Sequence, residues 1–427
     1  MKLVDRLAAG AVDTGDVYRY TASGAVPGCV IEPHSVDELA NAVRAAREGG
    51  LALIPAGNGT HLDIGWPPRR YDAALSTRRL DRIVAHDAAD MTVTAEAGVT
   101  LGELARVLAA AGQWLPLDPA RSEEMTIGGL IAADRSGPLR FGFGKVRDWL
   151  IGITVVTADG ERIRGGGRVV KNVAGYDLPK LFAGSFGTLG AIVEASFKVR
   201  PLPESEALFI WPARTLAQAL DAAMRTLTSS ILPVLMEAVN DAAAEALGLD
   251  ASTSLVIGCA GAAPHLDEQE RRLRELSGGE AYRVRDERTR ALRRALSGFS
   301  QPENDEGVVA RISARPTELA TCLPAVERAA AERGMVCEIA AHAGSGVAWC
   351  QLLGAPNERL LAEMCGWLRT TARERGVWLV FESLPPGLRA AVDPWGFDEP
   401  ALRLMRGIKQ ALDPSSVFSP GRFVGGI

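Results

Sequence analysis

The sequence lacks the cysteine spacings, long apolar runs and excess positive charge that mark several classes of protein. Its six cysteines include no C-x-x-C pair, so neither an iron–sulfur cluster nor a zinc ribbon is encoded, and we expect buried, reduced thiols of a cytoplasmic protein. No apolar run reaches the roughly 20 residues that span a bilayer. Charges at Lys2 and Asp5 come too early for a secretory signal, and a net charge of −5 gives no reason to expect nucleic acid as a partner.

What is present is the composition of a soluble globular protein, with 47% hydrophobic and 23% charged residues in 427, enough for two or three domains. The chain is organised around residues 55–65, which follow a strand-like run at 51–54. Gly57 and Gly59 flank Asn58, a residue type that tolerates left-handed backbone angles. Successive N–H groups in such a turn point into one concavity that suits a phosphate; a tight surface turn is the alternative.

This glycine-rich stretch is not a Rossmann fingerprint. Its sixth position is Leu62 where that motif has a third glycine, and two consecutive prolines follow, which cannot continue a helix. A dinucleotide bound here would therefore be held by N–H groups of the loop without a helix dipole. A second point of close backbone approach is the small-residue helix predicted over 126–133, which begins with Gly128 and Gly129; tight helix packing is the alternative.

Capping boxes predict two helices in the first half of the chain. Ser35 with Glu38, and Thr100 with Glu103, stand three residues apart before apolar residues at helical spacing. The first helix, the strand before it and the strand at 51–54 make one predicted βαβ unit.

Residues 168–200 carry three motifs whose order is specific. They are K-x-x-x-G-Y-D-L from Lys171, G-S-x-G-T-L-G from Gly184 and I-x-E-A from Ile192. This order resembles the FAD-binding domain shared by relatives of vanillyl-alcohol oxidase and p-cresol methylhydroxylase (the PCMH type). With the two upstream glycine segments, the resemblance covers residues 25–203 and implies a PCMH-type FAD-binding domain of two subdomains.

The resemblance implies FAD as the cofactor, with its pyrophosphate on the glycine loop and on the start of the helix at 126–133. In relatives whose R-S-G-G-H pattern bonds the flavin covalently, the histidine falls where this chain has Thr60. His61 is one place late, so we expect non-covalent FAD, and His61 as a mere rim residue is the alternative. The cofactor-binding residues expected from the resemblance are Pro55, Gly57, Asn58, Gly59, Thr60, His61, Asp118, Thr126, Gly128, Gly129, Arg147, Asp148, Gly187 and Ile192.

A second domain is predicted over 204–427. From residue 307 to residue 382 the apolar pattern predicts the order β-α-β-β-α-β, which is ferredoxin-like, and the same order is readable more weakly from 207 to 284. The predicted fold class is therefore α+β: the PCMH-type domain followed by a ferredoxin-like α/β cap domain, in which helices cover one face of an antiparallel sheet.

The end of the chain resembles FAD-linked 2-hydroxy-acid dehydrogenases, which close on D-P…F-x-P-G-[RK]. Arg422 fills the last position and is a candidate for the cofactor or substrate rim; a simple surface arginine is the alternative. Catalytic members hold a divalent metal with H-x-G-D-G-N-x-H and a later glutamate. Here His342 keeps the first histidine, Trp349 replaces the second, and Glu382 is followed by Ser383 where the relatives carry the base.

Two remaining ligands, His342 and Glu382, are fewer than a catalytic metal site normally has, so no metal is expected. Intact flavin motifs beside an eroded hydroxy-acid site resemble the second FAD-binding (E) subunits of bacterial glycolate oxidases. The resemblance implies a related FAD subunit and an iron–sulfur subunit as partners, a small 2-hydroxy acid as substrate of the complex, and a cytoplasmic location with any membrane association made through partners. The alternatives are a self-sufficient FAD oxidoreductase using His342, Glu382 or Arg422, and a flavin-fold scaffold without a redox role.

Overall fold

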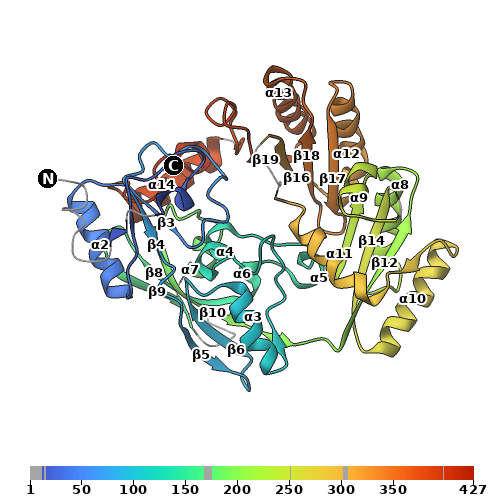
Figure 1. Ribbon diagram of the computed structural model, residues 1–427, viewed down its shortest axis with the longest axis horizontal. Coiled ribbons are helices and arrows are strands. Elements are labelled where there is room, and N and C mark those ends of the chain that lie inside the picture. Colours follow the sequence, from blue (N-terminus) through green and yellow to red (C-terminus); the bar gives the residue numbers. More distant parts are fainter. Residues whose placement is uncertain (1–11, 14–15, 168–175, 251, 302–305, 398) are drawn as a thin grey trace.

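The computed structural model describes residues 12–13, 16–167, 176–250, 252–301, 306–397 and 399–427. Lys171 and Gly175 of the K-x-x-x-G-Y-D-L segment lie outside these residues. The described residues up to 203 form the left half of Figure 1, here the N-terminal region, and those from 204 to 397 form the right half, the C-terminal region. The last helix, drawn in red, packs back against the N-terminal region.

The N-terminal region begins with a four-stranded sheet in the order β1-β2-β4-β3, in which β2, β4 and β3 are parallel. Its elements are β1 (Val12–Asp13), η1 (Val17–Tyr20), β2 (Cys29–Ile31), α2 (Val36–Glu48), β3 (Leu53–Ala56) and β4 (Ala73–Ser76). Ser35 caps α2 as predicted, while the Glu38 carboxylate accepts the N–H of His34. Because β4 lies between β2 and β3, the two strands of the predicted βαβ unit are not direct neighbours.

A second sheet, antiparallel throughout, completes the N-terminal region in the order β5-β6-β10-β8-β9. The predicted capping box of Thr100 and Glu103 is present in full at the start of α3. The strands are β5 (Ile83–Asp87), β6 (Thr92–Glu96), β8 (Leu150–Val156), β9 (Arg162–Gly166) and β10 (Ala191–Lys198), with the short pair β7 (Gln113–Trp114) and β11 (Arg200–Pro201) beside them. The helices are α3 (Leu101–Ala110), α4 (Ile127–Ala133), α5 (Arg140–Phe143), α6 (Val146–Trp149) and α7 (Leu178–Phe182).

The C-terminal region is built on one eight-stranded antiparallel sheet in the order β15-β12-β14-β13-β17-β18-β16-β19. Each half of this order is one β-α-β-β-α-β unit, with its fourth strand beside its first and its second strand at the centre of the sheet. The strands are β12 (Ser205–Pro212), β13 (Leu235–Val239), β14 (Ser254–Gly261), β15 (Tyr282–Arg283), β16 (Val308–Ser313), β17 (Val336–His342), β18 (Val347–Leu353) and β19 (Trp378–Ser383). The structure confirms the predicted α+β class and the duplicated ferredoxin-like order.

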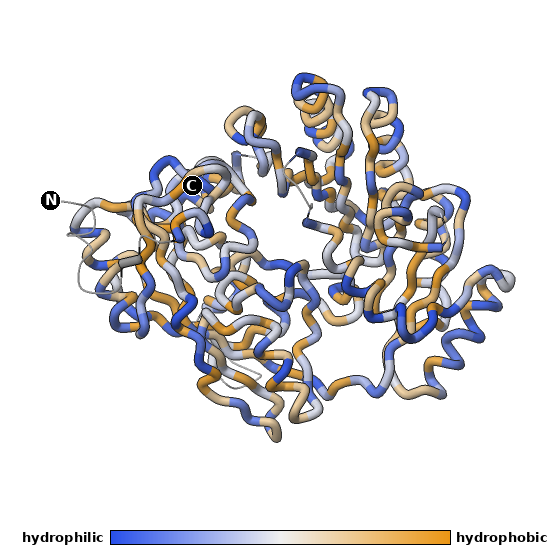
Figure 2. The backbone as a smooth tube through the Cα atoms, viewed as in Figure 1, coloured by the Kyte–Doolittle hydropathy of each residue, from blue (hydrophilic) through white to orange (hydrophobic). Residues whose placement is uncertain are grey.

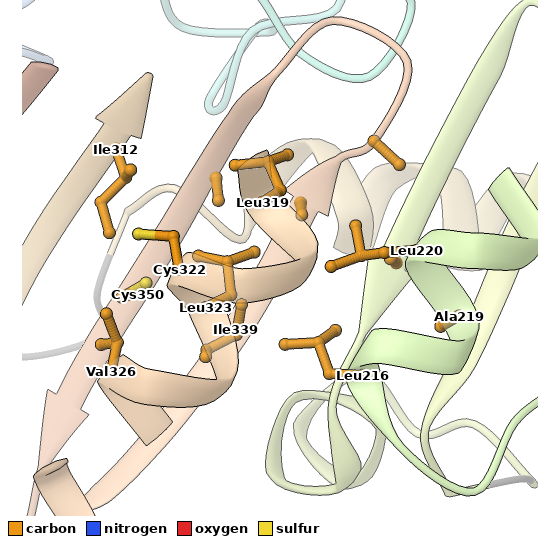
Figure 3. Packing of buried hydrophobic residues seen from close by; sticks show 14 of the residues in the cluster. Leu216, Ala219, Leu220, Ile312, Leu319, Cys322, Leu323, Val326, Ile339 and Cys350 are labelled. Carbon is orange, nitrogen blue, oxygen red and sulfur yellow. The ribbon is translucent and has the colours of Figure 1, made fainter. Parts of the chain in front are cut away.

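Helices cover one face of this sheet more fully than the other. The covered face carries α8 (Leu216–Leu227), α10 (Ala263–Ser277), α12 (Pro316–Ala331) and α13 (Glu358–Arg375). Figure 3 shows Leu319, Leu323 and Val326 of α12 packed toward Ile339 of β17, with Leu216 and Leu220 of α8 beside them. In Figure 2 the central strands are mostly orange and the outer helix α10 mostly blue, as burial of one helix face requires. The opposite face carries α9 (Asp241–Ala246) and α11 (Asp286–Gly298), and it faces the N-terminal region.

The end of the chain returns to the N-terminal region. After α14 (Glu399–Leu412), Leu53 and Phe418 form a parallel bridge, and η2 (Val424–Gly426) follows. Lys409 fixes the turn by donating to the Asp413 carboxylate at 2.7 Å and to the carbonyl of Thr188 at 2.7 Å. All six cysteines are buried and unpaired, as predicted, and none of the described helices is both long and apolar enough to cross a membrane.

Candidate functional site

The loop after β3 surrounds a cavity of about 60 Å³ and supplies it with free N–H groups. In the part of the chain that the structure describes, no protein acceptor bonds the N–H groups of residues 57–61. The predicted cofactor residues that line this cavity are Pro55, Gly57, Asn58, Gly59, Thr60, His61, Thr126, Gly129 and Gly187. The residues lining the cavity include no carboxylate, but they include the cation of Arg422. Free N–H groups and one cation, without a carboxylate, suit the phosphates of a dinucleotide.

Within residues 57–61 the left-handed backbone angle belongs to Gly59, with φ of 74°, and not to Asn58. A Cβ atom on Gly59 would lie 2.7 Å from the carbonyl oxygen of Arg19, so only glycine fits. Asn58 instead donates its side-chain amide to the carbonyl of Glu124 at 2.7 Å. The loop is therefore held between two backbone carbonyls, that of Arg19 beside Gly59 and that of Glu124 bonded by Asn58.

The start of α4 shapes the cavity but does not offer free N–H groups. The N–H groups of Ile127 and Gly128 bond the carbonyls of Val99 and Ala97, each at 2.8 Å, and Gly129 bonds the Thr126 side chain. A Cβ atom on Gly57 would collide with Thr126, and one on Gly128 would lie 2.9 Å from the Cβ of Ala97. The glycines of this helix therefore permit close packing, which was the alternative interpretation of the sequence, while the free donors come from the loop.

Three residues with left-handed backbone angles lie at this cavity, two of them in its lining. They are Phe186, with φ of 51°, Gly187, with φ of 65°, and Ser419, with φ of 46°. The Ser419 hydroxyl donates to the carbonyl of Gly187 at 3.1 Å, which holds the chain end against this turn. Such conformations cost about 1–3 kcal/mol each in residues other than glycine and gather at ligand sites.

A second cavity of about 40 Å³ shares Gly57 and Gly187 with the first and adds Gly128 and Ile192 to the lining. Both cavities are smaller than ordinary ligand pockets, which measure about 300–1,000 Å³. A dinucleotide is larger than either cavity, so one bound at this loop would extend beyond their walls.

Arg422 is buried in the wall of the first cavity, with 3% of its surface exposed. Its Nη2 donates to the carbonyls of Leu62, at 2.5 Å, and Ile64, at 3.0 Å. Its buried Nε has no partner among the described residues. Burial lowers the pKa of Arg422 to about 10, so the guanidinium stays charged at neutral pH. It is a cation at the cavity and not a simple surface arginine.

His61 points from the glycine loop toward the C-terminal region. Its Nδ1 lies 3.0 Å from the Thr60 hydroxyl, and its Nε2 lies 3.1 Å from the amide nitrogen of Gln301. The same amide donates to the carbonyl of Thr60 at 3.0 Å. Burial and the neighbouring Arg135 hold the pKa of His61 well below its usual range, so the ring is neutral and Nε2 accepts from Gln301.

Glu382, at the end of β19, is enclosed by three donors. Arg135 bonds both carboxylate oxygens, at 2.6 and 2.8 Å, Arg311 donates its Nε at 2.6 Å, and Trp349 donates its Nε1 at 3.0 Å. Burial opposes ionisation of Glu382, but the two arginines outweigh it and lower its pKa to about 2. The carboxylate is ionised and fully engaged, so it is available neither as a base nor as a metal ligand.

His342, at the end of β17, is likewise engaged. Its Nδ1 bonds the carboxylate of Glu237, and its ring meets the Trp349 ring edge-on, with centroids 4.5 Å apart. Trp349 thus lies between His342 and Glu382, in contact with both. Across the described residues no group of three or more histidine, cysteine, aspartate or glutamate side chains is placed to hold a metal ion.

Three predicted cofactor residues line neither cavity. Asp118 lies where the two regions meet, accepting the N–H of Leu139 at 3.2 Å and the hydroxyl of Ser297 at 3.1 Å, and burial raises its pKa to about 7. Arg147 and Asp148 lie on α6, both exposed, and Asp148 accepts the N–H of Lys145 at 2.8 Å.

Sequence analysis did not find four residues that contact the predicted ones, and two of them, Arg135 and Gln301, join the two regions. Arg135, Arg311, Gln301 and Glu237 each contact a predicted residue, yet none belongs to a motif. The left-handed backbone of Phe186 also has no sequence signal, because glycine or asparagine is the usual residue for that conformation.

Two families match successive parts of the chain. The FAD binding domain family matches residues 27–166, and the C-terminal domain of FAD linked oxidases matches residues 202–364 and 390–423.

Individual relatives differ in coverage. Glycolate oxidase subunit GlcD of Bacillus subtilis is 26% identical over 434 residues, covering 95% of this chain and 91% of its own. Glycolate oxidase subunit GlcE of Escherichia coli is 38% identical over 168 residues, covering 39% of this chain and 47% of its own. The structure of p-cresol methylhydroxylase with substrate bound is similar in fold, with a TM-score of 0.77 and 16% identity over 99% of this chain and 95% of that one.

Proposed function

Since the chain belongs to the FAD-linked oxidase family and binds FAD, we propose that it is an FAD-binding subunit of a glycolate oxidase, or 2-hydroxy-acid dehydrogenase, complex. The observation that carries the proposal is the contrast between two sites. The glycine loop offers free N–H groups to the cofactor, whereas the Glu382 carboxylate already accepts hydrogen bonds from Arg135, Arg311 and Trp349. Substrate oxidation then takes place mainly on a related flavin subunit.

In this proposal the chain divides into an FAD-binding domain, 25–203, and a cap domain, 204–427. FAD supplies the redox chemistry when bound, non-covalently because no histidine stands at position 60. Residues 57–61 donate N–H groups to its pyrophosphate, and Arg422 places a positive charge beside it. Gly187 and Ile192 contact the cofactor along the second cavity.

A catalytic role for His342 or Glu382 belongs to the alternative of a self-sufficient oxidoreductase, and the contacts of both residues disfavour it. A general base needs a free lone pair near the substrate, and Glu382 already accepts four hydrogen bonds from three residues. His342 is bonded to Glu237 and covered by Trp349. We infer that this polar cluster positions the cap domain, whereas Arg422, the third predicted residue, lines the cofactor cavity.

The identity of the subunit rests on its relatives. GlcE of Escherichia coli is 38% identical over the 168 residues that it matches, and GlcD is 26% identical over 434 residues, so the support for GlcE is a higher identity over a shorter stretch. We therefore propose the E-type role: electron relay or structural support beside a related FAD subunit and an iron–sulfur subunit in the cytoplasm. Any attachment to a membrane is then made by these partners.

A self-sufficient FAD oxidoreductase for a small hydroxy acid or alcohol is the second candidate function. The observation in its favour is the GlcD match, which spans 95% of the chain, including both regions around the cavity.

The deciding experiment is the visible spectrum of the purified, FAD-loaded chain without oxygen, before and after adding glycolate or D-lactate. A flavin that stays oxidised supports the subunit role, and activity with purified partner subunits should then require this chain. Bleaching by either acid, lost in His342→Ala, would replace the proposal by the second candidate.

A further inference from the structure

A cavity of about 520 Å³ lies in the C-terminal region, apart from the glycine loop. It opens where α9 and α11 meet the β12–β15 edge of the sheet. Its floor and walls are apolar, and the larger side chains among them are Ile210, Leu247, Leu249, Val284 and Leu292. The volume falls in the range of about 300–1,000 Å³ that is usual for small-molecule sites.

The rim of this cavity is positively charged. Arg283, Arg285 and Arg288 line it, against one carboxylate, Asp250. Arg288 is paired with Asp250, and Arg283 stands 3.5–3.8 Å from three carboxylates outside the lining. The guanidinium of Arg285 has no hydrogen-bond or ion-pair partner among the described residues, whereas its carbonyl accepts the N–H groups of Arg288 and Thr289. The lining therefore keeps an excess of positive charge beside an apolar floor.

We propose that this cavity binds a small organic anion with an apolar body, such as an aliphatic or aromatic carboxylate. The apolar part fits against Leu247, Leu249 and Leu292, and the anionic group meets Arg285 at the rim. Burial of the apolar part and a charge-assisted contact with the guanidinium act together in such a complex. The proposal concerns a site outside the cofactor cavities and does not depend on the proposed function.

Occupancy of the cavity is transmitted to the cofactor loop through α11. The middle of α11 forms one wall of the cavity, through Ala291, Leu292 and Ala295. The end of α11 and the residues after it contact the N-terminal region: Ser297 bonds Asp118 at 3.1 Å, and Gln301 bonds the Thr60 carbonyl at 3.0 Å. A ligand that shifts α11 changes these contacts, and by linkage FAD changes the affinity for that ligand to the same extent.

Isothermal titration of the FAD-loaded full chain with decanoate, and with uncharged decanol of equal chain length, tests the binding. We expect saturable binding that is tighter for decanoate. Arg285→Glu should raise its dissociation constant about tenfold, because a charge-assisted contact is lost. The matched control is Arg290→Glu, an exposed arginine of the same helix that does not line the cavity, and it should leave the constant unchanged.

Ala295→Phe provides a second variant, which fills the cavity and keeps the arginines. Any of three outcomes would overturn the site: equal binding of decanol and decanoate, binding that neither cavity variant changes, or no saturable binding. An absence of saturable binding would leave the arginine rim as a surface for an acidic partner protein. The coupling is read from the dissociation constant of FAD, which we expect to change about fivefold or more when decanoate is saturating. An unchanged FAD constant would refute the role given to α11.

Discussion

The indole Nε1 of Trp349 donates to the carboxylate of Glu382 at 3.0 Å. Its ring also meets the ring of His342, so one side chain fills the space between the two polar residues that sequence analysis selected as catalytic. This hydrogen bond and three more from two arginines, two from Arg135 and one from Arg311, satisfy the four acceptor directions of the carboxylate. The carboxylate of Glu382 therefore has no free acceptor position for a substrate.

Restoring an imidazole at this position should not restore hydroxy-acid chemistry. In Trp349→His, Arg135 and Arg311 still occupy Glu382, so we expect the flavin of the FAD-loaded variant to remain oxidised when glycolate is added without oxygen. The control is Trp378→His, which places the same change at a half-exposed residue of the same sheet. Bleaching in Trp349→His alone would show that the tryptophan was the sole obstacle.

The ion pair between Arg135 and Glu382 joins the two regions, and breaking it should be costly. Glu382→Gln leaves the buried guanidinium of Arg135 and the partly exposed guanidinium of Arg311 without their counter-ion, so we expect the free energy of unfolding at pH 7 to fall by about 3–5 kcal/mol. The exposed pair of Arg121 and Glu124 is the control, and Glu124→Gln should cost less than about 1 kcal/mol. Urea unfolding measures both variants.

The same variant predicts a pH dependence. The pKa of Glu382 is lowered from 4.5 to about 2 in the folded protein, so its stabilising contribution is complete above about pH 4.5 and disappears as the pH falls toward 2. The stability difference between the wild type and Glu382→Gln should therefore shrink through this window. A difference that is constant from pH 6 to pH 3 would contradict the assigned role.

For Asp118 we expect a pH dependence of stability opposite in sign to that of Glu382. Burial raises its pKa from 3.8 to about 7, so the folded protein binds the proton more tightly than the unfolded chain, and stability falls as the pH rises from about 4 to 7. Asp118→Asn keeps an acceptor for Leu139 and Ser297 and removes the charge. Its midpoint of thermal unfolding should rise relative to the wild type across this window, whereas the exposed Asp90→Asn should show no such trend.

Gly57→Ala should weaken retention of FAD. The added methyl group would collide with Thr126, which displaces the loop whose N–H groups are free. We expect the dissociation constant of FAD to rise at least about tenfold, measured by the quenching of flavin fluorescence, with little change in unfolding. Gly366→Ala, where the structure leaves open space around the added atom, is the control. Equal FAD affinity in both variants would mean that the loop does not hold the cofactor.

Much of the fold was predictable from local sequence patterns, because side-chain spacing and helix capping depend mainly on residues within one short segment. The duplicated strand–helix order and the cap at Thr100 follow from side-chain period and backbone capping, and the structure has both. The position of Trp349 was predicted from its place in a motif. The cluster around Glu382 was not, because Arg135 is 247 residues away and no local rule selects one arginine among many.

The role of individual glycines was also not predictable from composition. The sequence suggested Asn58 for the left-handed position, but the nearby backbone of Arg19 makes Gly59 the residue that adopts it. The N–H groups at the start of α4 were expected to face the cofactor, and instead they bond Val99 and Ala97. Each outcome depends on a neighbour brought by tertiary structure.

The pairing of β13 with β17 joins two similar ferredoxin-like units along one sheet, through register partners such as Ala238 and Ala341. Each unit alone would expose that strand as a bare edge, with unpaired N–H and C=O groups that associate with other chains. Because both units belong to one polypeptide, each meets its partner at an effective concentration set by the connecting chain. The sheet thus behaves like a dimer of two units within one chain, and its assembly is independent of protein concentration. Truncation between the units should yield fragments that self-associate through β13.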